Sequence, residues 1–141
     1  MRRYDLSVEE LSMNIFAITN NPLVQRAFEE DREQFCPDVK YLECSAEALL
    51  IAVRDKVHSG YSLISHPLAA SIRMIYSPYR TVILGAKEEK PDIHHIEVIE
   101  SSIIKHRQIT EHRISDDANS EAYQWIDLQL LYAALKEPLP F

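Results

Sequence analysis

The chain has 141 residues and a mass of 16.3 kDa, which fits a single domain. Hydrophobic residues make up 46% and charged residues 26%, a composition that excludes a wholly disordered chain. The 15 basic and 22 acidic side chains give a net charge of −7, so we expect no nucleic-acid or membrane partner, since both need a basic face. With only two glycines, the chain has neither a Walker loop nor a GxGxxG turn, and we expect no cofactor.

The N-terminal residues and the cysteines predict a cytoplasmic protein. An acidic pair, Glu9 and Glu10, stands where a signal peptide would have its apolar segment. No apolar run approaches the roughly 20 residues that cross a bilayer. Cys36 and Cys44 lack the CxxC spacing of a redox pair, and we interpret them as ordinary reduced thiols.

The first part of the chain predicts a helix, a strand and a second helix. Ser7 begins a capping-box pattern, which predicts a short helix before the first strand. Residues 14–19 form a continuous apolar run, typical of a strand buried on both faces. Asn21 suits the N-cap of the next helix and Pro22 its first position, and the helix should run to about residue 34.

The middle of the chain predicts three strands around a helix. Residues 39–44 alternate like a more exposed strand, and the next helix runs from a cap at Ser45 to an end at Gly60. Residues 62–65 and 81–84 predict a third and a fourth strand.

The last part of the chain predicts two helices. Pro91 and Asp92 open one of them, and the other runs from about Ser120 to Lys136 with more than one apolar stripe. We expect one domain over residues 1–141, with an N-terminal extension at 1–13 and a C-terminal helical extension at 115–141.

The order of these elements predicts an α/β layered domain. We expect a mostly parallel sheet of about four strands, with helices on both faces and an extra C-terminal helix. The direction of the fourth strand stays open, because the connection 66–80 is long enough for a crossover but has little helical signal.

Polar residues follow two strands that a parallel sheet would place side by side. Asn20 and Asn21 leave the first strand, while Ser65 and His66 leave the third. Ligands of open α/β sheets bind beyond the carboxyl ends of the strands, where strand order reverses. We therefore predict a site there, with His66 within side-chain reach of an asparagine.

Five of the six candidate ligand-binding residues also have a structural interpretation. Asn21 can serve only as a helix cap, and Asn20 can satisfy backbone groups at the turn. His66 can be a structural histidine that ties down the loop. Ser71 and Tyr79 complete the candidate set, but Ser71 can cap a turn and Tyr79 can pack against the sheet.

The remaining side chains give little support for catalysis or metal binding. His94 and His95 are adjacent on a helix and point apart, so we expect no metal. Ser65 and His66 point to opposite faces of a strand and make a poor dyad, and no GxSxG elbow is present. We predict no catalytic residue, which leaves enzymatic activity uncertain and disfavoured.

Several segments together resemble the GrdX family. They are residues 18–24 (ITNNPLV), 53–60 (VRDKVHSG), 65–68 (SHPL) and 77–81 (SPYRT). The resemblance covers about residues 15–107. The family consists of small proteins named for genes beside glycine reductase components in anaerobic bacteria, so the resemblance implies a genomic setting and no reaction.

Two main interpretations of function follow, with catalysis as a third. In the first, the chain is a non-catalytic accessory protein that binds a small polar metabolite, which the resemblance links to amino-acid (glycine) reductase systems. In the second, it is an interaction domain, a homodimer that buries part of the last helix through Trp125 or Leu131. In the third, His66 is a general acid–base in an enzyme, although no carboxylate is at hand to orient it.

Overall fold

The computed structural model describes residues 15–30, 38–113 and 116–136. The predicted helix at Ser7 and the thiol of Cys36 lie outside these residues. The strands are β1 (Phe16–Thr19), β2 (Asp38–Tyr41), β3 (Tyr61–Leu63) and β4 (Thr81–Lys87). The helices are α2 (Pro22–Glu30), α3 (Ala46–His58), α4 (Ile72–Ile75), α5 (Ile93–Thr110) and α6 (Ser120–Lys136), with a short 3₁₀ helix at Asp117–Asn119.

The four strands form one mixed sheet in the order β2-β1-β4-β3. β1 and β2 are parallel, whereas β4 is antiparallel to both β1 and β3. The α/β class is confirmed, but the prediction of a mostly parallel sheet is wrong. Because residues 64–80 hold only the four-residue α4, they do not form the crossover that a parallel return requires, and β4 runs back beside β3.

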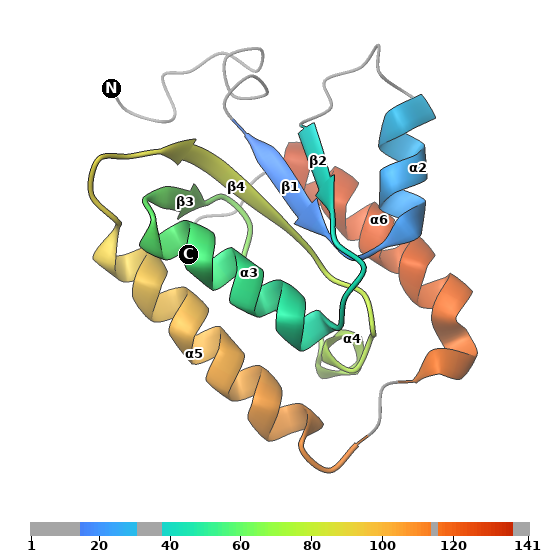
Figure 1. Ribbon diagram of the computed structural model, residues 1–141. Helices are drawn as coiled ribbons and strands as arrows, with labels where there is room; N and C mark the ends of the chain where they lie inside the picture. Colours follow the sequence, from blue (N-terminus) through green and yellow to red (C-terminus); the bar gives the residue numbers. More distant parts are fainter. Residues whose placement is uncertain (1–14, 31–37, 114–115, 137–141) are drawn as a thin grey trace.

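The helices cover both faces of this sheet, as predicted. Figure 1 shows α3 and α5 on one face and α2 and α6 on the other. Successive side chains of β4 supply both layers: Val82 and Leu84 pack with Leu50 and Val53 of α3, and Ile83 packs on the opposite face. Because both faces of β4 are buried, its sequence is a continuous apolar run rather than an alternating one.

The helix α6 is part of the core rather than an appendage. Its Leu128 and Leu131 pack with Val24 and Phe28 of α2, on the face of the sheet opposite α3 and α5. The predicted bounds of this helix are confirmed. In the described part of the chain, no helix has the length and apolar character needed to cross a membrane.

Candidate functional site

A buried hydrogen-bond network joins the end of β1 to the start of β4 and to α6. Its centre is Asp127 of α6, whose side chain is 1% exposed. Oδ2 of Asp127 accepts hydrogen bonds from Oγ1 of Thr81 at 2.6 Å and Nδ2 of Asn21 at 2.9 Å. Since Thr81 has one hydroxyl proton and gives it to the carboxylate, Thr19 must donate across the 2.7 Å contact between the two threonines. Thr19 in turn accepts the backbone N–H of Asn21 at 3.0 Å.

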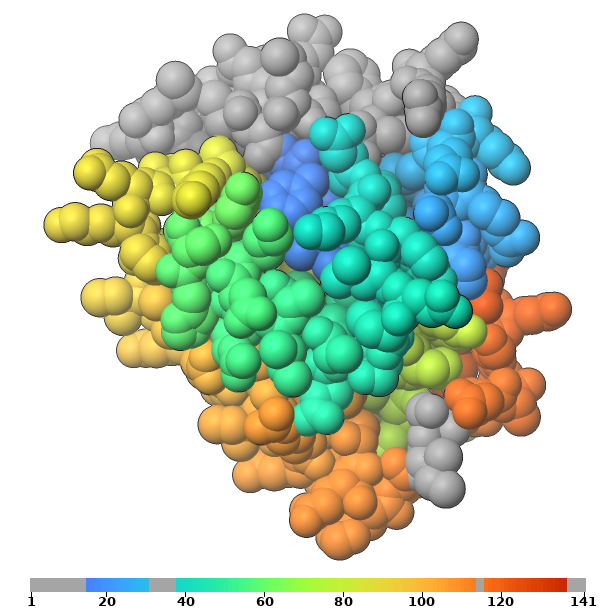
Figure 2. All heavy atoms as spheres, in the orientation of Figure 1, coloured from blue at the N-terminus to red at the C-terminus, as the bar shows by residue number. Residues whose placement is uncertain are grey.

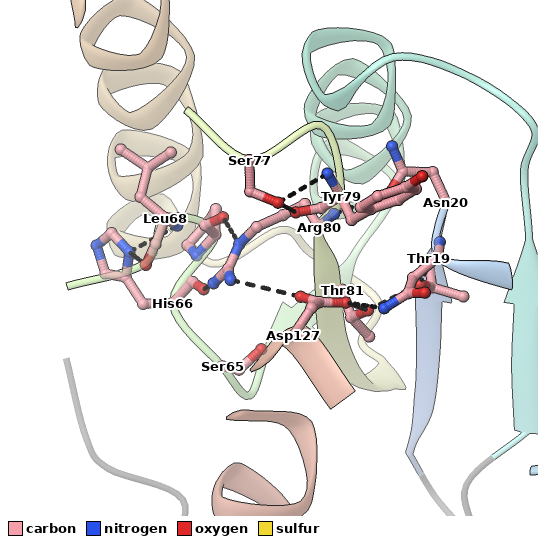
Figure 3. A network of polar contacts seen from close by, with 12 residues as sticks. Thr19, Asn20, Ser65, His66, Leu68, Ser77, Tyr79, Arg80, Thr81 and Asp127 are labelled. Atoms are coloured by element: carbon pink, nitrogen blue, oxygen red, sulfur yellow. Dashed lines mark hydrogen bonds and ion pairs between the residues drawn. The ribbon is translucent and has the colours of Figure 1, made fainter. Parts of the chain in front are cut away.

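Arg80 extends this network to the loop that follows β3. Its Nε donates to the carbonyl of Pro67 at 2.6 Å, and one terminal nitrogen donates to the carbonyl of His66 at 2.9 Å. The other terminal nitrogen lies 4.0 Å from Oδ1 of Asp127. Burial lowers the pKa of Arg80, while Asp127 opposes that shift. The cation thus fixes two loop carbonyls to a buried carboxylate, as Figure 3 shows.

The two asparagines after β1 have structural bonds at every side-chain polar atom. Nδ2 of Asn20 donates to the carbonyls of Cys44 and Pro78, both at 2.9 Å, and its Oδ1 accepts the N–H of Arg80 at 2.8 Å. Oδ1 of Asn21 accepts the N–H of Leu23 at 3.0 Å, which confirms the predicted N-cap of α2. The side chain of Asn20 therefore links the end of β1 to the segment at Cys44 and to the segment at Pro78 and Arg80.

The structure does not bring His66 to the asparagines. Since β4 lies between β1 and β3, the predicted crevice between neighbouring strand ends does not form. Figure 3 shows the imidazole of His66 and the side chain of Asn20 on opposite sides of Arg80. The exposed ring of His66 accepts the N–H of Leu68 at 3.0 Å, within the loop itself. This bond fits the structural interpretation of His66, and ligand contact by His66 stays a prediction.

The two candidate serines lie in local backbone roles. Oγ of Ser65 accepts the N–H of Ile83 at 2.8 Å and so continues the pairing of β3 with β4. Ser71 is exposed at the N-cap of α4, where its carbonyl accepts the N–H groups of Met74 and Ile75. Ligand binding by either serine stays a prediction.

Tyr79, the last candidate, reaches α6. Its hydroxyl lies 2.6 Å from Oγ of Ser120 and accepts a hydrogen bond from Nε2 of Gln124 at 3.0 Å. Tyr79 and Asn20 are the two candidates that also line a cavity.

That cavity has a volume of about 340 Å³ and lies between the start of α3, the segment after α4 and the end of α5. Figure 2 shows these three segments on the lower part of one face, in teal, yellow-green and orange. Its lining is Asn20, Cys44, Ser45, Ala46, Glu47, Ile75, Tyr76, Ser77, Pro78, Tyr79, His106, Thr110 and Arg113. The lining is therefore mixed, with aromatic and apolar walls and a few polar groups.

His106 is the most unusual group in this wall. The residue is 8% exposed, and its Nδ1 is buried without a hydrogen-bond partner in the structure. Burial lowers the pKa of His106 and so favours its neutral form, while the charge of Glu47 partly opposes this shift. Burial also raises the pKa of the Cys44 thiol, so the cavity holds no activated thiolate at that position.

Sequence reasoning missed Arg80, Asp127 and His106 as members of these clusters. Asp127 and His106 could have been found from the sequence, because each is a polar residue within an apolar stripe of its helix. Asp127 lies four residues from both Tyr123 and Leu131, and His106 follows Ile103 by three residues. No pattern in the sequence pointed to Arg80.

Comparison with known proteins identifies the family. A family model described as GrdX-like protein matches residues 16–136. The chain belongs to the GrdX-like family. The match includes α6 and is wider than the segment that carried the resemblance. No match was found among curated proteins or among solved structures.

Metal ligands do not gather within the described part of this GrdX-like protein: no three His, Cys, Asp or Glu side chains lie close enough together to hold an ion. The cavity beside His106 brings hydrogen-bonding groups together with aromatic and apolar walls.

Proposed function

We propose that this GrdX-like protein is a non-catalytic accessory domain that binds a small polar metabolite in the cavity beside His106. The cavity itself carries the proposal, because it combines aromatic and apolar walls with a few polar groups. The volume of about 340 Å³ lies in the range of small-molecule sites.

The chemistry of the cavity favours binding over catalysis. A general base needs a partner that orients it, and Nδ1 of His106 has none. The raised pKa of Cys44 works against a nucleophilic role for its thiol. Asn20 donates and accepts only in bonds that hold the backbone. These groups can recognise a ligand, but they give no proton-transfer pair.

The biological setting of this proposal comes from the family resemblance. We propose a cytoplasmic protein whose metabolite belongs to an amino-acid (glycine) reductase system. The alternative of a dimeric interaction domain is supported by α6, where Trp125 is 58% and Leu130 42% exposed.

A thermal-shift screen of the full chain against amino acids, amines and organic acids tests the proposal. A ligand at 100 times its Kd stabilises by about 2.7 kcal/mol, so a true ligand raises Tm. Thr110→Phe fills the cavity from α5 and should remove that rise. Gln108→Phe, at an exposed position on the same helix outside the cavity, is the matched control and should keep it. A panel in which no compound raises Tm, or a rise that survives Thr110→Phe, contradicts the proposal.

A further inference from the structure

We infer that a second site in this protein binds a small organic phosphate monoester, in a hollow lined by three lysines. The hollow has a volume of about 540 Å³ and lies where the start of β1 meets β2, the last turn of α3 and the end of β4. In Figure 2 the start of β1, in blue, is visible between β2 in teal, the later part of α3 in green and the yellow end of β4. Among the described residues, none lines both this hollow and the cavity beside His106, so the inference goes beyond the proposed function.

The three lysines give the hollow a positive charge. They are Lys40 of β2, Lys56 of α3 and Lys87 of β4, and Asp38 is the acidic side chain in the lining. Three positive charges and one negative leave +2 at this place, although the whole chain has a net charge of −7. Within residues 15–30, 38–113 and 116–136, no carboxylate lies at ion-pair distance from any of the three ammonium groups. Such a group of cations attracts an anion.

The ring of Tyr61 positions two of these lysines. Nζ of Lys56 lies 5.3 Å from the centre of the ring and Nζ of Lys87 lies 6.0 Å from it, both in the range of cation–π attraction. Tyr61 and Lys87 are cross-strand partners, while Lys56 stands in the last turn of α3, so two elements bring cations to one ring. Because like charges repel each other, an anion bound between the two lysines relieves that repulsion.

The number of charges favours a phosphate monoester over a carboxylate. A monoester carries a charge of about −1.5 to −2 at pH 7 and has three strong acceptor oxygens. This matches the charge of the lining and its three ammonium donors, whereas a single carboxylate would balance only half of that charge. Lysine is also a common phosphate ligand, because it acts as a point charge and needs no planar, bidentate partner.

The apolar part of the hollow suits the organic group of such an ester. Phe16 packs edge-on against Tyr61, with ring centres 5.3 Å apart and ring planes at 82°. Both rings line the hollow together with Ile15 and Val39. Inorganic phosphate would meet the same lysines but gain nothing from burial against these side chains. The ligand class is thus a phosphate monoester with a small apolar or aromatic group.

Titration of the full chain with three probes tests this class by ¹⁵N NMR. The probes are phenyl phosphate, inorganic phosphate and succinate, a dianion without phosphorus. We expect phenyl phosphate to shift the amide signals of Tyr61 and Ala86 and to bind more tightly than either other probe. Equal binding of succinate overturns the phosphate assignment, and equal binding of inorganic phosphate overturns the role of the aromatic rings. Absence of phenyl phosphate binding overturns the site.

Two further measurements separate this site from other sources of phosphate binding. Vesicles that contain phosphatidic acid present the same group on a membrane, and we expect them not to sediment the chain. Sedimentation with vesicles in the absence of phenyl phosphate binding would overturn the small-molecule assignment. Thr110→Phe, which fills the cavity beside His106, should leave phenyl phosphate binding unchanged. A loss of binding in Thr110→Phe would place the phosphate in that cavity and overturn the second site.

Removal of two lysines tests the charge. The double variant Lys56→Gln and Lys87→Gln should weaken phenyl phosphate binding about tenfold, since two exposed charge contacts are lost. Lys105→Gln with Lys136→Gln makes the same change in net charge at exposed positions outside the hollow, and it should leave the affinity as it is. Equal affinities of the two double variants contradict the inference.

Tyr61 and Asp38 test the geometry and the sign of the charge. Tyr61→Leu removes the ring that positions two lysines and should weaken binding, whereas Tyr61→Phe keeps the ring and should retain it. Asp38→Asn removes the negative charge of the lining and should tighten binding. Weaker binding in Asp38→Asn, or equal binding in Tyr61→Leu and Tyr61→Phe, contradicts the arrangement. If Tyr61→Leu does not fold, the two lysine double variants and Asp38→Asn decide.

Discussion

At the scale of single residues, Asp127 links α6 to Asn21, Thr81 and Arg80. A buried carboxylate is costly unless hydrogen bonds and a counter-charge offset its loss of water. Asp127 has both, since Asn21 and Thr81 donate to one oxygen and Arg80 lies near the other. The consequence is that α6, the end of β1 and the loop after β3 depend on one another.

Asn21 tests this dependence. Capping alone predicts that Asn21→Ala costs about 1 kcal/mol. Because the same amide also donates to Asp127, the variant leaves a buried acceptor with one bond fewer, and we expect a total loss of roughly 2–4 kcal/mol in the free energy of unfolding. Urea denaturation measures it. Ser45→Ala removes a cap without such a network and should cost only about 1 kcal/mol. Equal losses for the two variants would show that the network adds nothing.

His106 predicts how stability depends on pH. Burial lowers its pKa in the folded protein below the ordinary value of 6.5. As pH falls below that value, the unfolded chain takes up a proton that the folded protein refuses, so the unfolded state is favoured. We therefore expect stability to fall as pH drops below about 6.5.

His106→Gln should reduce this slope of Tm against pH, which scanning calorimetry from pH 7 to pH 5 measures. The slope should not vanish, since burial also lowers the pKa of His66. His112→Gln, at an exposed position, should leave the slope as it is. An unchanged slope in His106→Gln would contradict the assigned burial of this imidazole.

At the scale of elements, Gly60 controls how α3 turns into β3. Its φ is +117°, a conformation that other residues rarely adopt. A Cβ there would lie 2.3 Å from the carbonyl oxygen of Glu88, whose N–H donates to the carbonyl of Gly60 at 2.9 Å. We expect Gly60→Ala to lower the free energy of unfolding by at least about 1–3 kcal/mol. Ser59→Ala, one residue earlier and exposed, should stay within about 0.5 kcal/mol by urea denaturation. Equal stability of the two variants would contradict a strained turn.

Local patterns predicted these elements well because they depend on nearby residues. The cap at Asn21, the end of α3 at Gly60 and the span of α6 all follow from side chains within a few positions. The direction of β4 does not, because an apolar run such as residues 81–84 suits either direction. The short α4 was missed for a related reason, since four residues give no measurable period.

The candidate site depended on the strand order, so the error in the sheet carried over to it. A parallel β1–β3 pair would have placed His66 beside Asn20, but β4 occupies that position. Asn20 and Tyr79 line the cavity for another reason, because the segment before β4 returns to the end of β1. Long-range contacts of this kind leave no periodic trace in the sequence.

At the scale of the whole molecule, α6 presents both a buried and an open side. Tyr123, Leu128 and Leu131 are buried, so the rest of the domain covers more of the apolar surface of α6 than the sequence suggested. Trp125 and Leu130 remain on the outside. Trp125 is the larger and more exposed of the two, which makes it the stronger candidate for a contact between chains, and two-fold dimers dominate soluble oligomers.

We therefore predict a homodimer that buries Trp125, with Leu131 kept inside each protomer. Light scattering at tens of micromolar should give twice the chain mass of 16.3 kDa. Trp125→Glu places a charge in the contact and should shift the mass to that of one chain, while Tm at low concentration stays close to wild type. Gln108→Glu makes an equally charged change at an exposed, polar position of α5, on the other face of the sheet, and should leave the dimer intact. A wild-type mass of about 16 kDa at these concentrations would exclude the dimer, and a dimer that tolerates Trp125→Glu would place its interface elsewhere than on α6.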